Sequence, residues 1–138
     1  MSARITASLF GAALALIGTA ALGAEDPNSA NHVLRDCREA ITLENVANPV
    51  RMFAQGICTG TLRGISFTGA LVLASLRNFP LPENDWRRQW LCIAEPPGVT
   101  NIYRVQIVVA YIEARPARMH EDFQLLALEA LRTAWPCR

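Results

Sequence analysis

The chain has 138 residues, which is enough for one domain, and it carries 13 basic and 12 acidic side chains. All 13 basic residues are arginines, and they do not form long runs. A nearly neutral chain of this kind lacks the electrostatic footprint of a protein that binds nucleic acid or an anionic membrane surface. The composition therefore argues against nucleic acid as a partner.

The N-terminus has the pattern of a cleaved secretory signal. Arg4 is followed by an apolar run from Leu9 to Leu22 and then by small residues that end at Ala24. The run is shorter than the roughly 20 residues that span a bilayer, so a cleaved signal is favoured over a membrane anchor. We expect residues 1–24 to be removed and residues 25–138 to form one exported, periplasmic domain without membrane attachment.

The first helix of this domain is predicted from His32 to Leu43, after a short polar leader in which Asn28 or Ser29 serves as N-cap. Five residues at helical spacing form its apolar face: Val33, Leu34, Cys37, Ala40 and Ile41.

The apolar run from Met52 to Leu76 predicts a long central helix around which the rest of the chain packs. Asn48 and Pro49 begin it, and the asparagine and prolines from residue 78 onwards end it. An apolar face of this helix is formed by residues that recur at steps of four and three: Cys58, Leu62, Ile65, Gly69, Val72 and Leu76.

Three glycines, Gly56, Gly60 and Gly64, form a stripe on this helix. Each glycine costs roughly 1 kcal/mol relative to alanine in a helix interior. We therefore expect a compensating close approach along the stripe, by another helix of the chain or by a second subunit.

Residues 77–97 contain four prolines and form the longest irregular stretch, in which residues 83–92 have room for one or two helical turns. This stretch carries Trp86, Arg87, Arg88 and Trp90. Tryptophan packs in cores by default, but aromatic residues beside arginines are also typical of protein-interface hot spots. The sequence leaves both interpretations open.

Two further helices are predicted. The first has Thr100 as its N-cap and reaches Pro116, and its buried face contains Val105, Val108, Val109 and Ile112. Its β-branched residues also suit a strand, but the sequence offers no partner strand, so a helix is favoured. The last helix is expected from His120 to Ala134, with Glu121 and Asp122 complementing its dipole. Its core face contains Phe123, Leu126, Ala127, Ala130 and Leu131. The predicted fold is all-α, with about four helices.

The four cysteines, Cys37, Cys58, Cys92 and Cys137, predict two disulfide bonds, because an even count in an exported chain is ordinarily a disulfide framework. Their spacing lacks the close ligand pairs of zinc sites, and we expect no metal or cofactor. If the last two helices form an antiparallel hairpin, Cys92 lies beside Cys137 and Cys37 pairs with Cys58. The alternative pairing, Cys37 with Cys92 and Cys58 with Cys137, remains open.

Cys58 lies among small residues, between Gly56 and Gly60, in a setting similar to that of a catalytic nucleophile. Thiol catalysis requires a free thiol and an oriented base. Three other cysteines are available to pair with Cys58, and His32 and His120 both lie at predicted helix starts, where a capping role suffices. We therefore expect no enzyme activity.

Four segments of the chain form a pattern when they are taken in order. They are the glycine–cysteine pattern from Gly56 to Gly64, Cys92-Ile93 before residues 96–100, the helix from Val105 to Ile112 before Arg115-Pro116, and Ala127 to Leu131 before Trp135-Pro136-Cys137. Together these segments resemble the Rap and Tai amidase-immunity proteins of type VI secretion. The resemblance covers most of the exported part.

This resemblance implies a small, helical, disulfide-bonded periplasmic protein that binds and inhibits a peptidoglycan amidase effector, usually as a homodimer. It implies no chemistry by the immunity protein itself. Two alternatives stay open: a periplasmic acid-stress chaperone similar to the Hde proteins, and a diverged exported protein that binds another partner. An amidase encoded in a neighbouring reading frame favours immunity, and acid-induced expression without one favours the chaperone.

Overall fold

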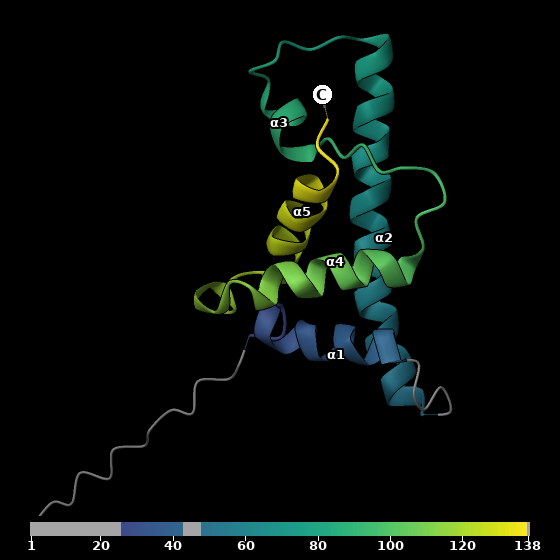
Figure 1. Ribbon diagram of the computed structural model, residues 1–138, viewed down its shortest axis with the longest axis vertical. Coiled ribbons are helices and arrows are strands. Elements are labelled where there is room, and N and C mark those ends of the chain that lie inside the picture. The colour runs from purple at the N-terminus through teal and green to yellow at the C-terminus, as the bar shows by residue number, and fades with distance from the viewer. Residues whose placement is uncertain (1–25, 43–47, 138) are drawn as a thin grey trace, which may run out of the picture.

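The structure is a computed structural model that describes residues 26–42 and 48–137; the expected signal peptide, residues 1–24, lies outside this part. The described residues form helices and no β-strand (Figure 1). The elements are α1 (Ala30–Thr42), α2 (Pro49–Asn78), α3 (Trp86–Leu91), α4 (Asn101–Glu113), the 3-10 turn η1 (Pro116–Arg118) and α5 (Phe123–Ala134). The all-α prediction is confirmed, with α3 as a short helix beside the four expected ones.

Helix α2 is the long central helix that the sequence predicts. It begins at Pro49 because the side chain of Asn48 accepts hydrogen bonds from the backbone N–H groups of Val50, at 3.0 Å, and Arg51, at 3.4 Å. Helices α1, α4 and α5 pack against it, and α3 lies beside its C-terminal part (Figure 1). The core therefore lies along one side of α2.

The core contains the predicted apolar faces of α1, α4 and α5. Its buried residues include Val33, Leu34, Cys37, Val105, Val108, Ile112, Phe123, Leu126, Ala127, Ala130 and Leu131. From α2 it takes Cys58 and Leu62, with Ile65 packed partly against it. Ile93 also joins the core, because Ala94 donates a backbone hydrogen bond of 2.9 Å to Trp135 and holds this segment beside the chain end.

The close approach to α2 occurs at a different glycine from those of the stripe. A Cβ atom added to Gly69 would lie 2.6 Å from the Cβ of Ile93, so the side chain of Ile93 fills the space that this glycine leaves. A Cβ atom on Gly56, Gly60 or Gly64 would meet no atom of the described chain within 4 Å. The expectation that a helix of the same chain packs on the stripe is therefore wrong, because α1, α4 and α5 all pack on the opposite side of α2.

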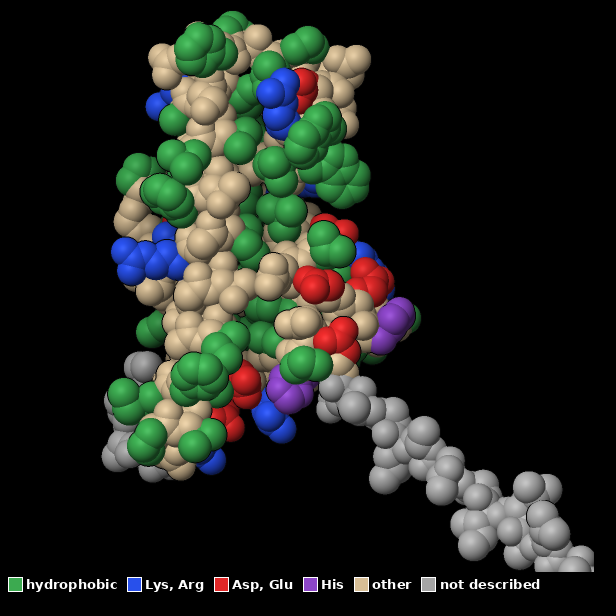
Figure 2. All heavy atoms as spheres, turned by 180° about the vertical axis from the view of Figure 1, so that it is seen from behind, with side chains coloured by type: hydrophobic (Ala, Val, Ile, Leu, Met, Phe, Trp, Pro, Cys, Tyr) green, Lys and Arg blue, Asp and Glu red, His purple; other side chains and the backbone are tan. Residues whose placement is uncertain are grey.

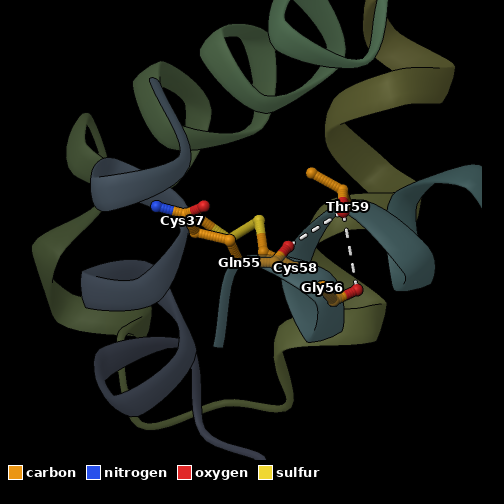
Figure 3. The surroundings of a disulfide bond; sticks show 5 residues. All are labelled: Cys37, Gln55, Gly56, Cys58 and Thr59. Atoms are coloured by element: carbon orange, nitrogen blue, oxygen red, sulfur yellow. Dashed lines mark hydrogen bonds between the residues drawn. A yellow bond between two sulfur atoms is a disulfide. The ribbon is translucent and has the colours of Figure 1, made fainter. Parts of the chain in front are cut away.

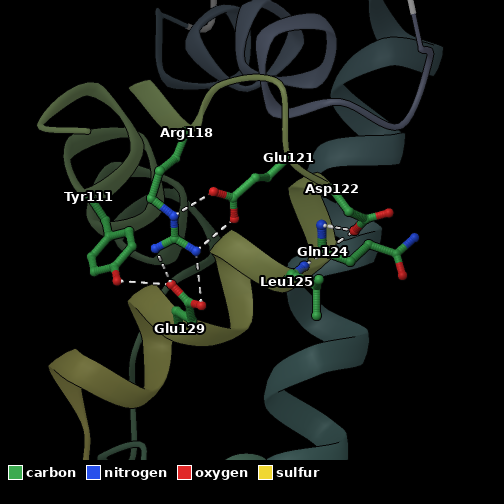
Figure 4. A network of polar contacts seen from close by, with 7 residues as sticks. All are labelled: Tyr111, Arg118, Glu121, Asp122, Gln124, Leu125 and Glu129. Atoms are coloured by element: carbon green, nitrogen blue, oxygen red, sulfur yellow. Dashed lines mark hydrogen bonds and ion pairs between the residues drawn. The ribbon is translucent and has the colours of Figure 1, made fainter. Parts of the chain in front are cut away.

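Helix α5 begins later than predicted. Asp122 is its N-cap, and its Oδ1 accepts hydrogen bonds from Gln124, at 2.8 Å, and Leu125, at 3.2 Å (Figure 4). His120 and Glu121 therefore precede the helix. Glu121 pairs with Arg118 instead of complementing the helix dipole within the first turn.

Two disulfide bonds, Cys37–Cys58 and Cys92–Cys137, join the elements, and the pairing is the one favoured from the hairpin argument. The first links α1 to α2, beside Thr59, whose hydroxyl donates to the carbonyl of Gln55 at 2.8 Å (Figure 3). The second joins the residue after α3 to the end of the chain, so it fixes α3 near the C-terminus of α5. All four cysteines are bonded.

Candidate partner-binding surface

Helix α3 is a six-residue helix that carries Trp86, Arg87, Arg88 and Trp90 on the surface. Asp85 starts it, since its side chain accepts a hydrogen bond of 2.9 Å from the backbone N–H of Arg87. None of its residues is buried, and Trp86 is 61% exposed. The interpretation of Trp86 as a core residue is therefore wrong, because α3 contacts α2 and α5 but buries none of its own residues between them.

Arg87 is held in one orientation by Asp85. The guanidinium Nε and Nη2 atoms donate hydrogen bonds of 2.9 and 2.8 Å to the two carboxylate oxygens. These side-chain bonds lower the pKa of Asp85 to about 2, and the same carboxylate raises the pKa of Arg87. A forked pair between residues two apart in sequence gives α3 a fixed cation next to an exposed tryptophan.

Trp90 is covered on one side by an arginine from α5. The guanidinium of Arg132 lies 4.7 Å from the centre of the indole ring, and it donates a hydrogen bond of 2.6 Å to the backbone oxygen of Gln89. Together with the Cys92–Cys137 disulfide, these contacts fix the C-terminal end of α3 relative to α5. The four residues predicted as a partner interface thus lie on a surface helix that is anchored to α5 at one end.

An apolar groove separates α3 from the C-terminal half of α2. It has a volume of about 490 Å³, and Figure 2 shows hydrophobic side chains along this region between α2 and α3. Its lining residues are Thr68, Leu71, Val72, Ser75, Leu76, Phe79, Leu81, Trp86, Arg87 and Leu91. The sequence analysis did not predict the contribution of α2, because Val72 and Leu76 continue the spacing of the apolar face that contains buried Cys58 and Leu62, and spacing alone does not distinguish a groove wall from a core.

The chain matches the family model described as Rap1a immunity proteins over residues 29–137. The chain belongs to this family. The comparisons with curated proteins and with solved structures give no match. The matched range contains every described helix and both disulfide bonds of this Rap1a-family chain.

The Rap1a-family fold removes the basis for a catalytic role of Cys58. Its sulfur is bonded to Cys37, and the residue is fully buried, so it offers no thiolate. His32 lies in the first turn of α1, and His120 precedes α5. No group of three or more potential metal-ligating side chains occurs within the described ranges.

The other notable surface of this Rap1a-family chain is the uncovered side of α2. It carries the three glycines of the stripe and two exposed aromatic side chains, Phe53 and Phe67, which are 71% and 64% exposed. Helix α2 is long enough and apolar enough to cross a membrane, by length and composition alone. Only 22% of its apolar 18-residue stretch is buried. Its other side, however, carries core residues and a disulfide bond to α1, as expected of the core helix of a folded domain.

Proposed function

We propose that this protein is a periplasmic immunity protein that binds a peptidoglycan amidase effector of a type VI secretion system and blocks its active site. The match to the Rap1a immunity proteins over residues 29–137 carries this proposal. Two disulfide bonds are consistent with an exported protein, because such bonds persist in oxidising compartments. Residues 1–24 act as the export signal in this proposal and are then removed.

Helix α3 is the proposed inhibitory surface. A binding surface loses less entropy when its side chains are already ordered, and Arg87 and Trp90 are held by Asp85 and Arg132 before any partner arrives. Exposed tryptophan and arginine side chains are also the types that dominate binding energy at interfaces. The immunity protein inhibits by occupying the cleft of the amidase and performs no chemistry of its own.

The uncovered side of α2 is the proposed surface for a homodimer. If two α2 helices cross antiparallel at Gly60, each position faces the one equally distant on the other side of Gly60. Gly56 then faces Gly64, and exposed Phe53 faces exposed Phe67. Small residues at the crossing allow two helix backbones to approach closely, and the aromatic pairs bury apolar area on either side.

The test uses the mature chain, residues 25–138, and the amidase encoded in the adjacent reading frame. We expect a stable complex on size-exclusion chromatography and loss of amidase activity on isolated peptidoglycan. In cells that export the amidase to the periplasm, the full-length chain protects against lysis. A chain without residues 1–24 does not protect, because it stays in the cytoplasm.

Full amidase activity in the presence of excess folded protein would contradict the proposal. A parallel assay follows the aggregation of an unrelated, acid-unfolded protein at low pH. Suppression of that aggregation, without any effect on the amidase, would identify the acid-stress chaperone instead.

A further inference from the structure

The apolar groove between α2 and α3 has the properties of a preformed binding site. Its volume of about 490 Å³ falls within the roughly 300–1,000 Å³ of typical ligand-binding clefts. Large apolar side chains from both walls remain in contact with solvent, and Phe79 is 75% exposed. Leaving such surface uncovered is unfavourable, so the groove is a place where a partner gains affinity by burying apolar area.

The groove keeps its shape without a ligand because both walls are fixed. Its long wall is a regular helix that continues to Asn78, and the backbone N–H of Phe79 still bonds to Ser75, at 2.8 Å. Its short wall, α3, is capped by Asp85 and tied to the chain end by the Cys92–Cys137 disulfide. A partner therefore binds a preformed groove, and the complex loses no free energy in ordering the groove walls.

Arg87 is the single charged residue among those that line the groove. Asp85 occupies its Nε and Nη2 atoms, and Nη1 makes no hydrogen bond within the described part of the chain. The guanidinium thus retains a donor next to the apolar walls. A carboxylate of a partner is the group that complements this donor best.

We propose that the groove binds a short segment of the effector that presents a large apolar side chain followed closely by an aspartate or glutamate. The apolar side chain enters between Leu76 and Trp86, and the carboxylate accepts a hydrogen bond from Arg87. This inference rests on the proposed function for the origin of the segment, but the chemistry that the groove selects is tested without the effector.

The first experiment selects a displayed library of random 12-residue peptides on the folded, full-length mature protein. We expect enriched peptides to share a large apolar residue with an acidic residue one to four positions away. Ser75→Trp fills the exposed groove wall and should weaken binding of the selected peptides at least 30-fold. Ala110→Trp, an exposed substitution on α4, is the matched control and should leave binding unchanged.

The charge is tested by repeating the selection on Arg87→Gln, with Arg35→Gln as control. Arg35 is also exposed and lies beside an aspartate, Asp36, at 3.6 Å. The Arg87 variant should keep the apolar preference and lose the acidic one, and the control should keep both. No enrichment, enrichment of basic peptides, or equal binding to Ser75→Trp would each overturn the inference.

The second experiment measures affinity for the amidase and separates this inference from the proposed function. Ser75→Trp should weaken the complex at least 30-fold, about 2 kcal/mol. If the amidase binds the wild type and Ser75→Trp with equal affinity, the groove inference is wrong and the proposed function stands. If no amidase binds but acidic, apolar peptides are selected, the proposed function is wrong and the groove stands. A change of sedimentation in Ser75→Trp alone would assign the groove to a second copy of the chain and overturn the inference.

Discussion

Arg118 binds two carboxylates at once, between η1 and α5. Its Nε and Nη2 atoms donate to Glu121, both at 2.7 Å, and its Nη1 atom donates to Glu129 at 2.7 Å (Figure 4). The hydroxyl of Tyr111 adds a bond of 3.1 Å to Glu129. These bonds hold the turn between α4 and α5 closed. Sequence spacing predicted only a helix-dipole role for Glu121, since the position of Arg118 depends on how the turn folds.

The ion pairs predict how stability depends on pH. Hydrogen bonds from Arg118 lower the pKa of Glu129 below its usual value, as they do for Glu121. A lowered folded-state pKa contributes stability above the unfolded-state pKa of about 4.5, and this contribution is lost as pH falls through the lower folded-state value. Glu129→Gln should therefore cost roughly 1 kcal/mol at pH 7 and very little near pH 2.

Thermal or urea unfolding between pH 2 and pH 7 checks this prediction, with Glu83→Gln as a control for the loss of one exposed carboxylate. If the difference in free energy of unfolding between Glu129→Gln and the wild type stayed constant from pH 2 to pH 7, the charge of the Glu129 carboxylate would contribute no stability.

At the scale of single elements, the sequence predicts helix starts and buried faces where these depend on neighbouring residues. Asn48 and Thr100 cap α2 and α4 as expected, because capping needs only the residue and the next two or three N–H groups. The start of α5 was misplaced, since either His120 or Asp122 could begin the same apolar spacing. Which face of α2 stays uncovered depends on where three other helices pack, and spacing does not contain that information.

The glycines of α2 give a prediction at this scale. Gly69→Ala should destabilise the fold by roughly 1–3 kcal/mol, because its Cβ atom would overlap Ile93. Gly60→Leu meets open space in the single chain, so the helix should remain folded. In the proposed dimer the same leucine lies at the crossing point, and it should raise the dimer dissociation constant at least about 100-fold, or about 2.7 kcal/mol.

Sedimentation equilibrium and circular dichroism of the two variants distinguish these effects. A Gly60→Leu protein with the wild-type dimer constant would place the interface elsewhere on the surface. Wild-type stability of Gly69→Ala would show that Ile93 moves aside without cost.

At the scale of the whole molecule, the sequence predicts the fold class and disulfide framework better than the surfaces. Helical periods and four cysteines are local or countable features, and the structure has the all-α fold and both disulfide bonds. The groove arises where α3 leaves a gap beside α2, so it depends on residues such as Leu71 and Trp86 that are distant in sequence. The sequence singled out two of the residues that line the groove, Trp86 and Arg87, but its pattern did not predict the shape of the groove.

The exposed position of Trp86 makes a decisive test of the proposed inhibitory surface. Trp86→Ala combined with Arg87→Ala should weaken binding to the amidase by at least about 2 kcal/mol, the usual scale of an interface hot spot. The melting temperature should change little, because neither side chain is buried in the core. Calorimetric titration with the amidase and a thermal unfolding curve measure the two quantities on the same protein.

Trp135 provides the matched control for truncation of a tryptophan. It packs partly against the core and lies 6.4 Å from Tyr103 between ring centres. Trp135→Ala should cost roughly 3 kcal/mol of stability, whereas the affinity of its folded fraction for the amidase should be preserved. An unchanged affinity of the folded double variant would move the interface away from α3. If the double variant and Trp135→Ala both lose affinity in proportion to the fraction that is unfolded, Trp86 supports the fold and does not contact the amidase. A residue of the binding surface lowers the affinity of the folded protein, whereas a structural residue lowers the melting temperature first.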